Sequence, residues 1–119
     1  MPKLLIVDDE QDIRDFASNF FKKRQIEALT ASNGDEALKI IEEEKPDLVL
    51  LDIRMDGKSG VDTLRTLRQN NDNTKVIMVT GVEDEEVISE VKSIGIIGYI
   101  HKPLVLQELE KIVLGELEK

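Results

Sequence analysis

Three acidic residues at the ends of two apolar runs could together bind a divalent metal ion. Asp8 and Asp9 directly follow the run Leu4–Val7, and Asp52 directly follows the run Leu48–Leu51. If both runs are strands of an open α/β sheet, these carboxylates lie beyond the strands' carboxyl ends, where the sites of such sheets form. Clustered carboxylates repel one another, and a hard cation removes that conflict because it prefers oxygen ligands. We therefore expect an acidic site that depends on Mg²⁺ or Mn²⁺.

A hydroxyl and an amine follow two further apolar runs and extend this chemistry. Thr80 and Gly81 follow one run, and His101, Lys102 and Pro103 follow the other. A lysine supplies positive charge, and a threonine hydroxyl can hydrogen-bond a phosphoryl oxygen, so both could neutralise charge in phosphoryl transfer. An aspartate can itself be the nucleophile and form an acyl phosphate. The pattern therefore favours phosphoryl transfer at this edge of the sheet.

These residues must be positioned by an alternation of apolar and amphipathic segments. The apolar runs lack polar alternation, which is typical of parallel strands covered on both faces, and the segments between them repeat with helical periodicity. Repeated βα units imply a parallel sheet with right-handed crossovers and helices on both faces. The predicted strands are Leu4–Val7, the weaker edge segment Ile26–Ala31, Leu48–Leu51, Val76–Val79 and Ile96–Ile100, and the helical pattern covers Ile13–Phe21, Ala37–Ile41, Val61–Leu67, Val87–Ile94 and Leu106–Val113.

Local signals refine the helices. Capping boxes from Ser32 to Asp35 and from Ser59 to Asp62 predict two helix starts. The phenylalanines of the first helix are expected to belong to the core rather than to a cofactor site.

Composition excludes several classes of protein. The 119 residues suit one domain, 1–119, and 40% apolar with 34% charged residues argues against a disordered tail or a membrane protein. Without cysteine and with a single histidine, the chain has no disulfide scaffold, thiolate site or multi-histidine site. The net charge of −9 argues against nonspecific binding to nucleic acid or an anionic membrane. Because the first apolar run is too short for a signal peptide, we expect a cytoplasmic protein.

Five short motifs in order resemble a response-regulator receiver domain, the phospho-acceptor module of two-component signalling. The resemblance covers essentially the whole chain and implies an α/β fold, a (βα)5 doubly wound five-stranded parallel sheet in the flavodoxin-like order 2-1-3-4-5. The matching residues are Val7-Asp8-Asp9-Glu10, Asp47 to Asp52, Met55 with Gly57 and Gly60, Val79-Thr80-Gly81, and Tyr99-Ile100-His101-Lys102-Pro103.

The resemblance implies a role for each acid. Asp52 would accept a phosphoryl group from the phosphohistidine of a sensor histidine kinase or phosphotransfer protein. Asp9 would bind Mg²⁺ directly, with Asp8 acting nearby or through water. Asp52 and the backbone carbonyl of Arg54 would complete the protein ligands.

The resemblance also implies a conformational switch. Lys102 would pair first with Asp52 and then with the phosphoryl group, and its peptide bond to Pro103 is expected to be cis. Thr80 would move to hydrogen-bond the phosphoryl oxygen while Tyr99 rotates inward. The responsive face would run from Glu83 to Lys119 and would bind a downstream target or a second copy. Such a domain would be a self-phosphorylating, autodephosphorylating switch rather than a turnover enzyme, with no direct contact to nucleic acid or membrane.

Three residues raise separate questions. Asp56 stands where the family usually has proline, which leaves the geometry of that loop open. Arg54 and Val82, each two residues beyond Asp52 and Thr80, flank the expected path of the hydrolytic water, and we hypothesise that they set the lifetime of the phosphorylated state.

Structural interpretations compete with these roles. Asp8, Asp9 and Glu10 could be first-turn acids favoured by a helix dipole. Thr80 with Glu83 fits a capping box. The Lys102-Pro103 pair could mark a helix start, Tyr99 could be routine strand packing, and His101 is expected to be an exposed strand-end residue without a chemical role.

Other functions remain as alternatives. The chain could be the receiver part of a longer regulator with a DNA-binding or enzymatic output domain. A haloacid-dehalogenase-type phosphatase is disfavoured because its Asp-x-Asp motif is missing, and a flavodoxin-like cofactor binder because acids replace its phosphate loop. A pseudo-receiver that binds partners without phosphorylation is disfavoured by the complete acceptor set.

Overall fold

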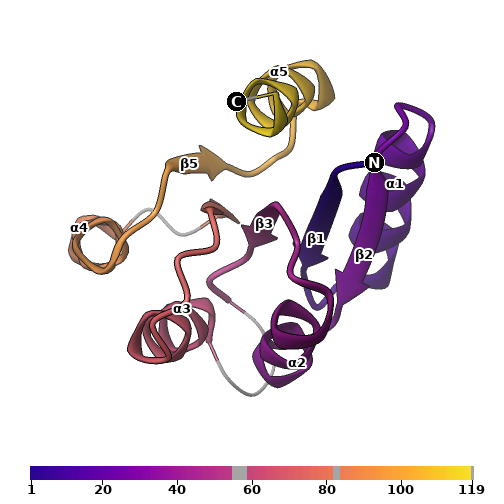
Figure 1. Cartoon of the computed structure of the whole chain (residues 1–119). Coiled ribbons are helices and arrows are strands. Elements are labelled where there is room, and N and C mark those ends of the chain that lie inside the picture. The colour runs from indigo at the N-terminus through magenta and orange to yellow at the C-terminus, as the bar shows by residue number, and fades with distance from the viewer. Residues whose placement is uncertain (55–58, 82–83, 119) are drawn as a thin grey trace.

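The protein folds into one five-stranded parallel sheet between two layers of helices. The computed structural model describes residues 1–54, 59–81 and 84–118. The strand order is β2-β1-β3-β4-β5, with every neighbouring pair parallel. Helices α1 and α5 cover one face, and α2, α3 and α4 cover the other (Figure 1). The predicted doubly wound (βα)5 fold and its strand order are confirmed.

The ten elements alternate along the chain. In order they are β1 (Lys3–Val7), α1 (Gln11–Lys22), β2 (Glu27–Ala31), α2 (Gly34–Glu44), β3 (Leu48–Leu51), α3 (Gly60–Gln69), β4 (Val76–Thr80), α4 (Glu85–Ile94), β5 (Gly98–His101) and α5 (Leu106–Leu117).

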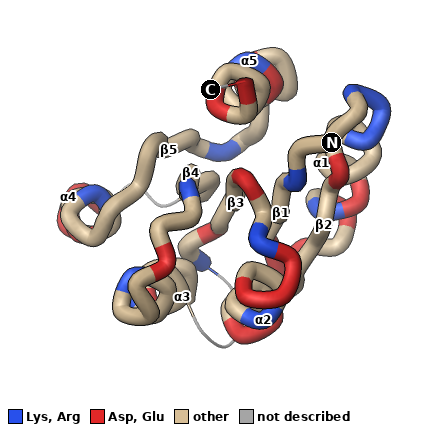
Figure 2. Tube along the Cα trace, in the orientation of Figure 1, with Lys and Arg blue, Asp and Glu red and all other residues tan. Residues whose placement is uncertain are grey.

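The strands are apolar throughout because both of their faces are covered. In β1, Leu5 and Val7 pack beneath α2 and α3, whereas Leu4 and Ile6 pack beneath α1 and α5. Alternate residues of a strand point to opposite faces, so a strand between two helical layers needs apolar residues at every position. Charged residues therefore lie mainly on the helices and connections, and the central strands are largely uncharged (Figure 2).

The residues that cap α2 and α4 differ from those that the sequence suggested. The cap of α2 is Asn33 rather than Ser32: its side chain accepts from the backbone N–H of Glu36 at 2.8 Å. Ser32 instead donates its hydroxyl to the Glu36 carboxylate. Sequence spacing allows either register, and asparagine caps at least as well as serine.

Helix α3 does begin at its predicted cap, because Ser59 accepts from the backbone N–H of Asp62 at 3.2 Å. The cap of α4 is Asp84, which accepts from Glu86. Thr80 ends β4 and is not that cap, while Glu83 lies outside the described residues.

The prediction that all the phenylalanines of α1 are core residues was wrong for one of them. Phe21 is fully buried and Phe20 is partly buried, but Phe16 is 60% exposed. Its ring lies on the rim of α1, where helical periodicity alone does not separate a core position from a boundary position. Strand β5 also begins at Gly98 rather than Ile96, because Ile96 and Ile97 belong to the connection from α4. Among the described residues, none of the helices has the length and apolar character needed to cross a membrane.

Candidate functional site

Asp8 and Asp52 stand side by side at the carboxyl ends of two adjacent strands. Val7 and Leu51 are partners in the β1–β3 register, so the next residue of each strand emerges at the same level. The backbone N–H of Asp52 still donates to Val7 O at 3.1 Å, which extends the ladder to the site. The two aspartates are only 4% and 5% exposed. Buried carboxylates need a partner, because an unpaired buried charge is strongly disfavoured.

Lys102 is that partner. Its ammonium donates to Oδ2 of Asp8 at 2.7 Å and to Oδ2 of Asp52 at 2.9 Å. Its backbone N–H donates to Thr80 O at 2.9 Å, so the residue following β5 stays aligned with the end of β4. The Lys102–Pro103 peptide is cis, as expected. Burial lowers the pKa of Lys102. Its hydrogen bonds to Asp8 and Asp52 and the charges of these two residues together raise the pKa by more than burial lowers it, so the pKa lies above its usual value of 10.5.

Asp8 also belongs to a group of three acidic residues that extends from the buried pair to the solvent. Carboxylate oxygens of Asp8, Asp9 and Glu10 lie within 4.8 Å of one another, and Asp9 and Glu10 are exposed. The backbone N–H of Glu10 donates to Oδ1 of Asp8 at 2.9 Å, which fixes the turn between β1 and α1. These donors are all oxygens, and the exposed side leaves room for water, which is the combination that Mg²⁺ prefers. The acidic residues therefore fit a divalent hard cation.

Thr80, Tyr99 and Arg54 are the remaining described residues of the expected set. Thr80 is fully buried at the end of β4, opposite His101 in the β4–β5 register. Tyr99 is a partly buried residue of β5 that packs against the core on the α4 face. Arg54 has an exposed side chain, and its backbone N–H makes a long contact of 3.3 Å to Oδ1 of Asp52. The structure thus brings Asp8, Asp52 and Lys102 into direct contact and places Thr80 and Arg54 around them.

Gly60 keeps the chain after Asp52 in place by the absence of a side chain. A Cβ at this position would lie 2.0 Å from the backbone oxygen of Asp52 and 2.8 Å from Ile53 Cα. The backbone N–H of Gly60 donates to Ile53 O at 2.8 Å, so the start of α3 packs directly on the segment that carries Asp52. Only glycine allows this approach. The motif analysis singled out Gly60 but did not give it this role.

Arg14 is a site residue that sequence reasoning missed. Its guanidinium donates to the backbone oxygen of Asp8 at 2.6 Å, from one turn into α1. It thereby holds α1 against the end of β1. The sequence did contain a sign of this role, because Arg14 is a basic residue on the partly buried side of a helix start that is otherwise acidic.

Several motif residues lie outside the described part of the chain. They are Met55, Asp56 and Gly57 of the loop after β3, and Val82 and Glu83 after β4. The effect of Asp56 on its loop and the proposed influence of Val82 on hydrolysis remain predictions.

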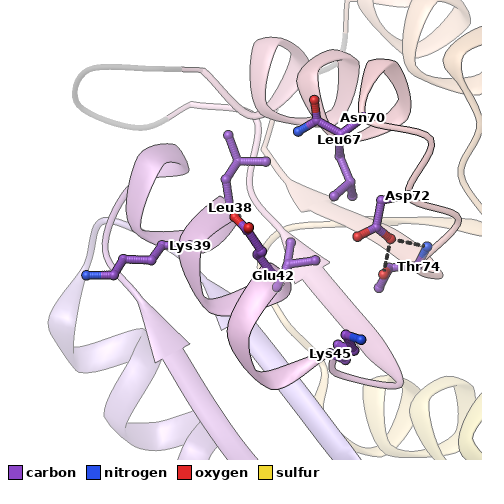
Figure 3. Close-up of a pocket in the computed structure, with 9 residues that line it drawn as sticks. Leu38, Lys39, Glu42, Lys45, Leu67, Asn70, Asp72 and Thr74 are labelled. Carbon is purple, nitrogen blue, oxygen red and sulfur yellow. Dashed lines mark hydrogen bonds between the residues drawn. The ribbon is translucent and has the colours of Figure 1, made fainter.

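The described residues also form a cavity in a different region. It has a volume of about 800 Å³ and lies between α2 and α3, at the edge where β3 and β4 begin. Leu38 and Leu67 face each other across it, whereas Lys39 points away, and Asp72 is bonded to Thr74 (Figure 3). Asp52 lies beyond the opposite end of β3, so this cavity is separate from the acidic site.

Comparison with known proteins gives a consistent match. The family model described as the response regulator receiver domain matches residues 4–114. The chain is 35% identical over 111 residues to sporulation initiation phosphotransferase F of Bacillus subtilis, covering 93% of this chain and 90% of that protein. Five other curated relatives are longer, and the chain spans only 25% to 53% of their length.

Solved structures match over nearly the full chain. A CheY-like response regulator receiver domain protein from Methanospirillum hungatei has a TM-score of 0.93 at 29% identity, covering 99% of this chain and 94% of that one. The response regulator TrrA from Thermotoga maritima, in complex with Mg²⁺ and BeF, has a TM-score of 0.85 at 33% identity, covering 98% of this chain and 100% of that one.

Proposed function

Because the chain belongs to the response regulator receiver domain family of two-component systems, we propose that Asp52 is its phosphoryl acceptor. The observation that carries this assignment is the shared ammonium of Lys102, which holds the carboxylates of Asp8 and Asp52 together in a buried position. Both aspartates follow a strand, but only Asp52 is followed by a backbone that Gly60 keeps close. Oδ1 of Asp8 accepts from the backbone N–H of Glu10 at 2.9 Å, whereas the matching contact from Arg54 to Oδ1 of Asp52 is longer, at 3.3 Å.

The transfer requires one bond to form and one to break. A carboxylate oxygen of Asp52 attacks the phosphorus of a phosphohistidine, and the P–N bond breaks as the P–O bond forms. The electron pair of the P–N bond returns to the imidazole nitrogen, and the ring, protonated on its other nitrogen, leaves as neutral imidazole. Lys102 neutralises negative charge at the carboxylate before transfer and at the phosphoryl group afterwards.

Asp9, Asp8, Asp52 and the backbone carbonyl of Arg54 would hold Mg²⁺ or Mn²⁺. When bound, the ion supplies positive charge that offsets the negative charge of the carboxylates and the phosphoryl oxygens. Asp9 is the exposed member of the set, so it offers a carboxylate to the ion without first breaking a buried ion pair.

The signal would be a change in population between two arrangements. Phosphorylation adds roughly −1.5 to −2 charge and strong acceptor oxygens, to which the hydroxyl of Thr80 can donate once it moves. Tyr99, on the neighbouring strand, would turn inward with it. The effect would be read on α4, β5 and α5, within 84–118, by a downstream protein or a second copy. On this view the domain is a switch that phosphorylates and dephosphorylates itself rather than a turnover enzyme.

An apolar surface beside Lys102 suits the approach of the phosphohistidine donor. Phe16, Ile13, Pro103 and Leu104 line an open cavity of about 420 Å³ that also includes Lys102. Phe16 is 60% exposed, which is unusual for a ring of this size. The surface is continuous with the acceptor site through Lys102, so a helical histidine-bearing partner seated here would bring its phosphoryl group to Asp52. We take the partner to be a histidine kinase or a phosphotransfer protein.

The longer curated relatives support a second possibility about context. The same domain could act within a regulator that carries an output domain, since two relatives are named as transcriptional regulatory proteins and the chain spans 53% and 49% of their length. The acceptor chemistry would be identical in both cases.

Chemical trapping tests the assignment of the acceptor. The protein is treated with Mg²⁺ and acetyl phosphate and then with borohydride, which reduces an aspartyl phosphate to homoserine. Peptide mapping should find homoserine at position 52. Homoserine at position 8 or 9 instead would contradict the assignment, and no homoserine at all would favour a phosphorylation-independent binding module.

A further inference from the structure

The single histidine and the single tyrosine of the chain lie against each other on the last strand. Tyr99 and His101 are two residues apart on β5, so their side chains project from the same face of the sheet. Their ring centroids are 4.9 Å apart and the ring planes are inclined by 59°. This separation falls within the range at which aromatic rings attract each other.

The two rings have different surroundings. Tyr99 is partly buried and packs against the core cluster that includes Val91 of α4, whereas His101 is exposed. Both rings line an open cavity of about 450 Å³ beneath α4. The other lining residues are Glu85, Ile88, Ser89 and Lys92. His101 is exposed and absent from the two core clusters, and its ring contacts that of Tyr99.

The backbone connects this pair to the acceptor site. His101 is the register partner of Thr80, and the backbone N–H of Lys102 donates to Thr80 O at 2.9 Å. His101 therefore lies between Tyr99 and Lys102 in sequence and opposite Thr80 in space. A change at Thr80 reaches His101 across one pair of strands.

We infer that His101 is a positioning residue for Tyr99, whose ring contact holds the tyrosine in its resting orientation. This inference rests on the proposed function, in which Tyr99 turns inward after phosphorylation of Asp52. In this proposal the inward turn takes the ring of Tyr99 away from His101, so the contact stabilises one of the two orientations and not the other. A contact that is present in one state and absent in the other shifts the equilibrium between the two states. His101 thus sets how strongly the unphosphorylated protein favours its resting state.

The chain's composition makes a direct test available. Labelling with 3-fluorotyrosine places one ¹⁹F reporter in the protein, at Tyr99. The variants are His101→Ala, which removes the ring, and His101→Phe, which keeps an aromatic ring at the same position. Ser89→Ala is the matched control, because it changes another residue of the same cavity and leaves both rings in place. Spectra are recorded before and after adding Mg²⁺ and acetyl phosphate, and circular dichroism confirms that each variant is folded.

The expected result concerns the unphosphorylated protein first. His101→Ala should raise the population of the phosphorylated-like ¹⁹F signal by about two- to tenfold, the size expected for one aromatic contact. His101→Phe should restore the wild-type signal, and Ser89→Ala should leave it unchanged. If His101→Ala leaves the Tyr99 signal unaltered, or if His101→Phe fails to restore it, the inference is wrong.

If the proposed function itself is wrong, the same experiment gives a different result. In that case the wild-type ¹⁹F signal would not respond to Mg²⁺ and acetyl phosphate, whatever the residue at position 101. A wild-type signal that responds to phosphorylation but is indifferent to His101→Ala would overturn the role of His101 alone.

Discussion

Lys102 and Asp52, 50 residues apart in sequence, form a salt bridge of 2.9 Å whose carboxylate is almost completely buried. The same ammonium is 2.7 Å from Asp8, so one cation balances two acids. Removing one partner of a buried pair leaves an uncompensated charge, whereas removing a surface charge has little effect. This asymmetry gives the first prediction.

Lys102→Met should destabilise the protein by about 1–3 kcal/mol in the absence of divalent ions, less than for a fully buried pair because the edge of the site is open to water. Mg²⁺ should recover much of that loss and should bind the variant about five- to tenfold more tightly than wild type, because the competing ammonium is gone. Urea unfolding and Mg²⁺ titration measure both effects. Lys111→Met, on the exposed side of α5, is the matched control. Equal Mg²⁺ affinity in wild type and Lys102→Met would argue against competition for the same carboxylates.

The raised pKa of Lys102 predicts how its contribution to stability depends on pH. Hydrogen bonds and the charges of Asp8 and Asp52 outweigh burial and lift the pKa above the usual 10.5. A group whose pKa is raised on folding stabilises the protein fully below its unfolded pKa and loses that effect as the pH rises through its folded pKa. The difference in unfolding free energy between wild type and Lys102→Met should therefore be constant from pH 7 to 9 and should shrink only above 10.5. A steady decline between pH 7 and 9 would contradict the assigned direction.

Phe16→Ala should separate two kinds of phosphoryl donor. The ring is exposed, so its loss should change stability by less than about 1 kcal/mol. Phosphorylation by a phosphorylated histidine kinase domain should slow by about tenfold, the size of effect expected for an aromatic anchor of an interface. The rate with acetyl phosphate should not change, since a small donor needs no docking surface. Ile97→Ala, another exposed apolar residue, is the control. Equal slowing with both donors would mean that Phe16 acts on the acceptor site itself.

Arg68 should matter more for stability than its neighbour Arg65. Arg68 donates to the backbone oxygen of Gly95 at 2.9 and 3.3 Å and to that of Asp72 at 2.8 Å, which ties the ends of α3 and α4 together. Burial lowers its pKa, and the charge of Asp72 opposes that shift only in part.

Replacing Arg68 by methionine should cost about 1–3 kcal/mol, since two backbone carbonyl oxygens lose a donor. Arg65 bridges Asp62 and Glu90 on the surface, and Arg65→Met should cost below about 1 kcal/mol. Thermal unfolding of the two variants gives the comparison, and equal losses would rule out this difference in role.

The neighbouring positions of Asp8 and Asp52 could be predicted because they depend on register alone. Two apolar runs, each followed at once by an acid, place their acids together wherever the strands are parallel neighbours. The contact of Lys102 with both acids needed more than register. It depends on the path of the chain after β5. The resemblance to a family predicted the pairing of Lys102 with Asp52 but not its bond to Asp8, and the local sequence gave only a proline.

Details that depend on close packing could not be predicted in the same way. The approach of Gly60 to the backbone of Asp52 is set by how α3 docks, and a glycine at a helix start does not reveal in the sequence which backbone it contacts. Phe16 has the same periodicity as Phe20, but its exposure depends on where α5 and Leu104 lie. Asn33 and Ser32 are both good caps, and one residue of helix register decides between them.

Intact-mass measurement after incubation with Mg²⁺ and acetyl phosphate tests the central claim most directly. The samples are wild type, Asp52→Asn, wild type without Mg²⁺, and Asp62→Asn, which removes an exposed carboxylate from α3. We predict one added phosphoryl group on wild type and on Asp62→Asn, and none on Asp52→Asn or without the metal. A phosphoryl group of equal yield on Asp52→Asn, or none on folded wild-type protein while another receiver domain is labelled in parallel, would contradict the assignment of Asp52 as the acceptor.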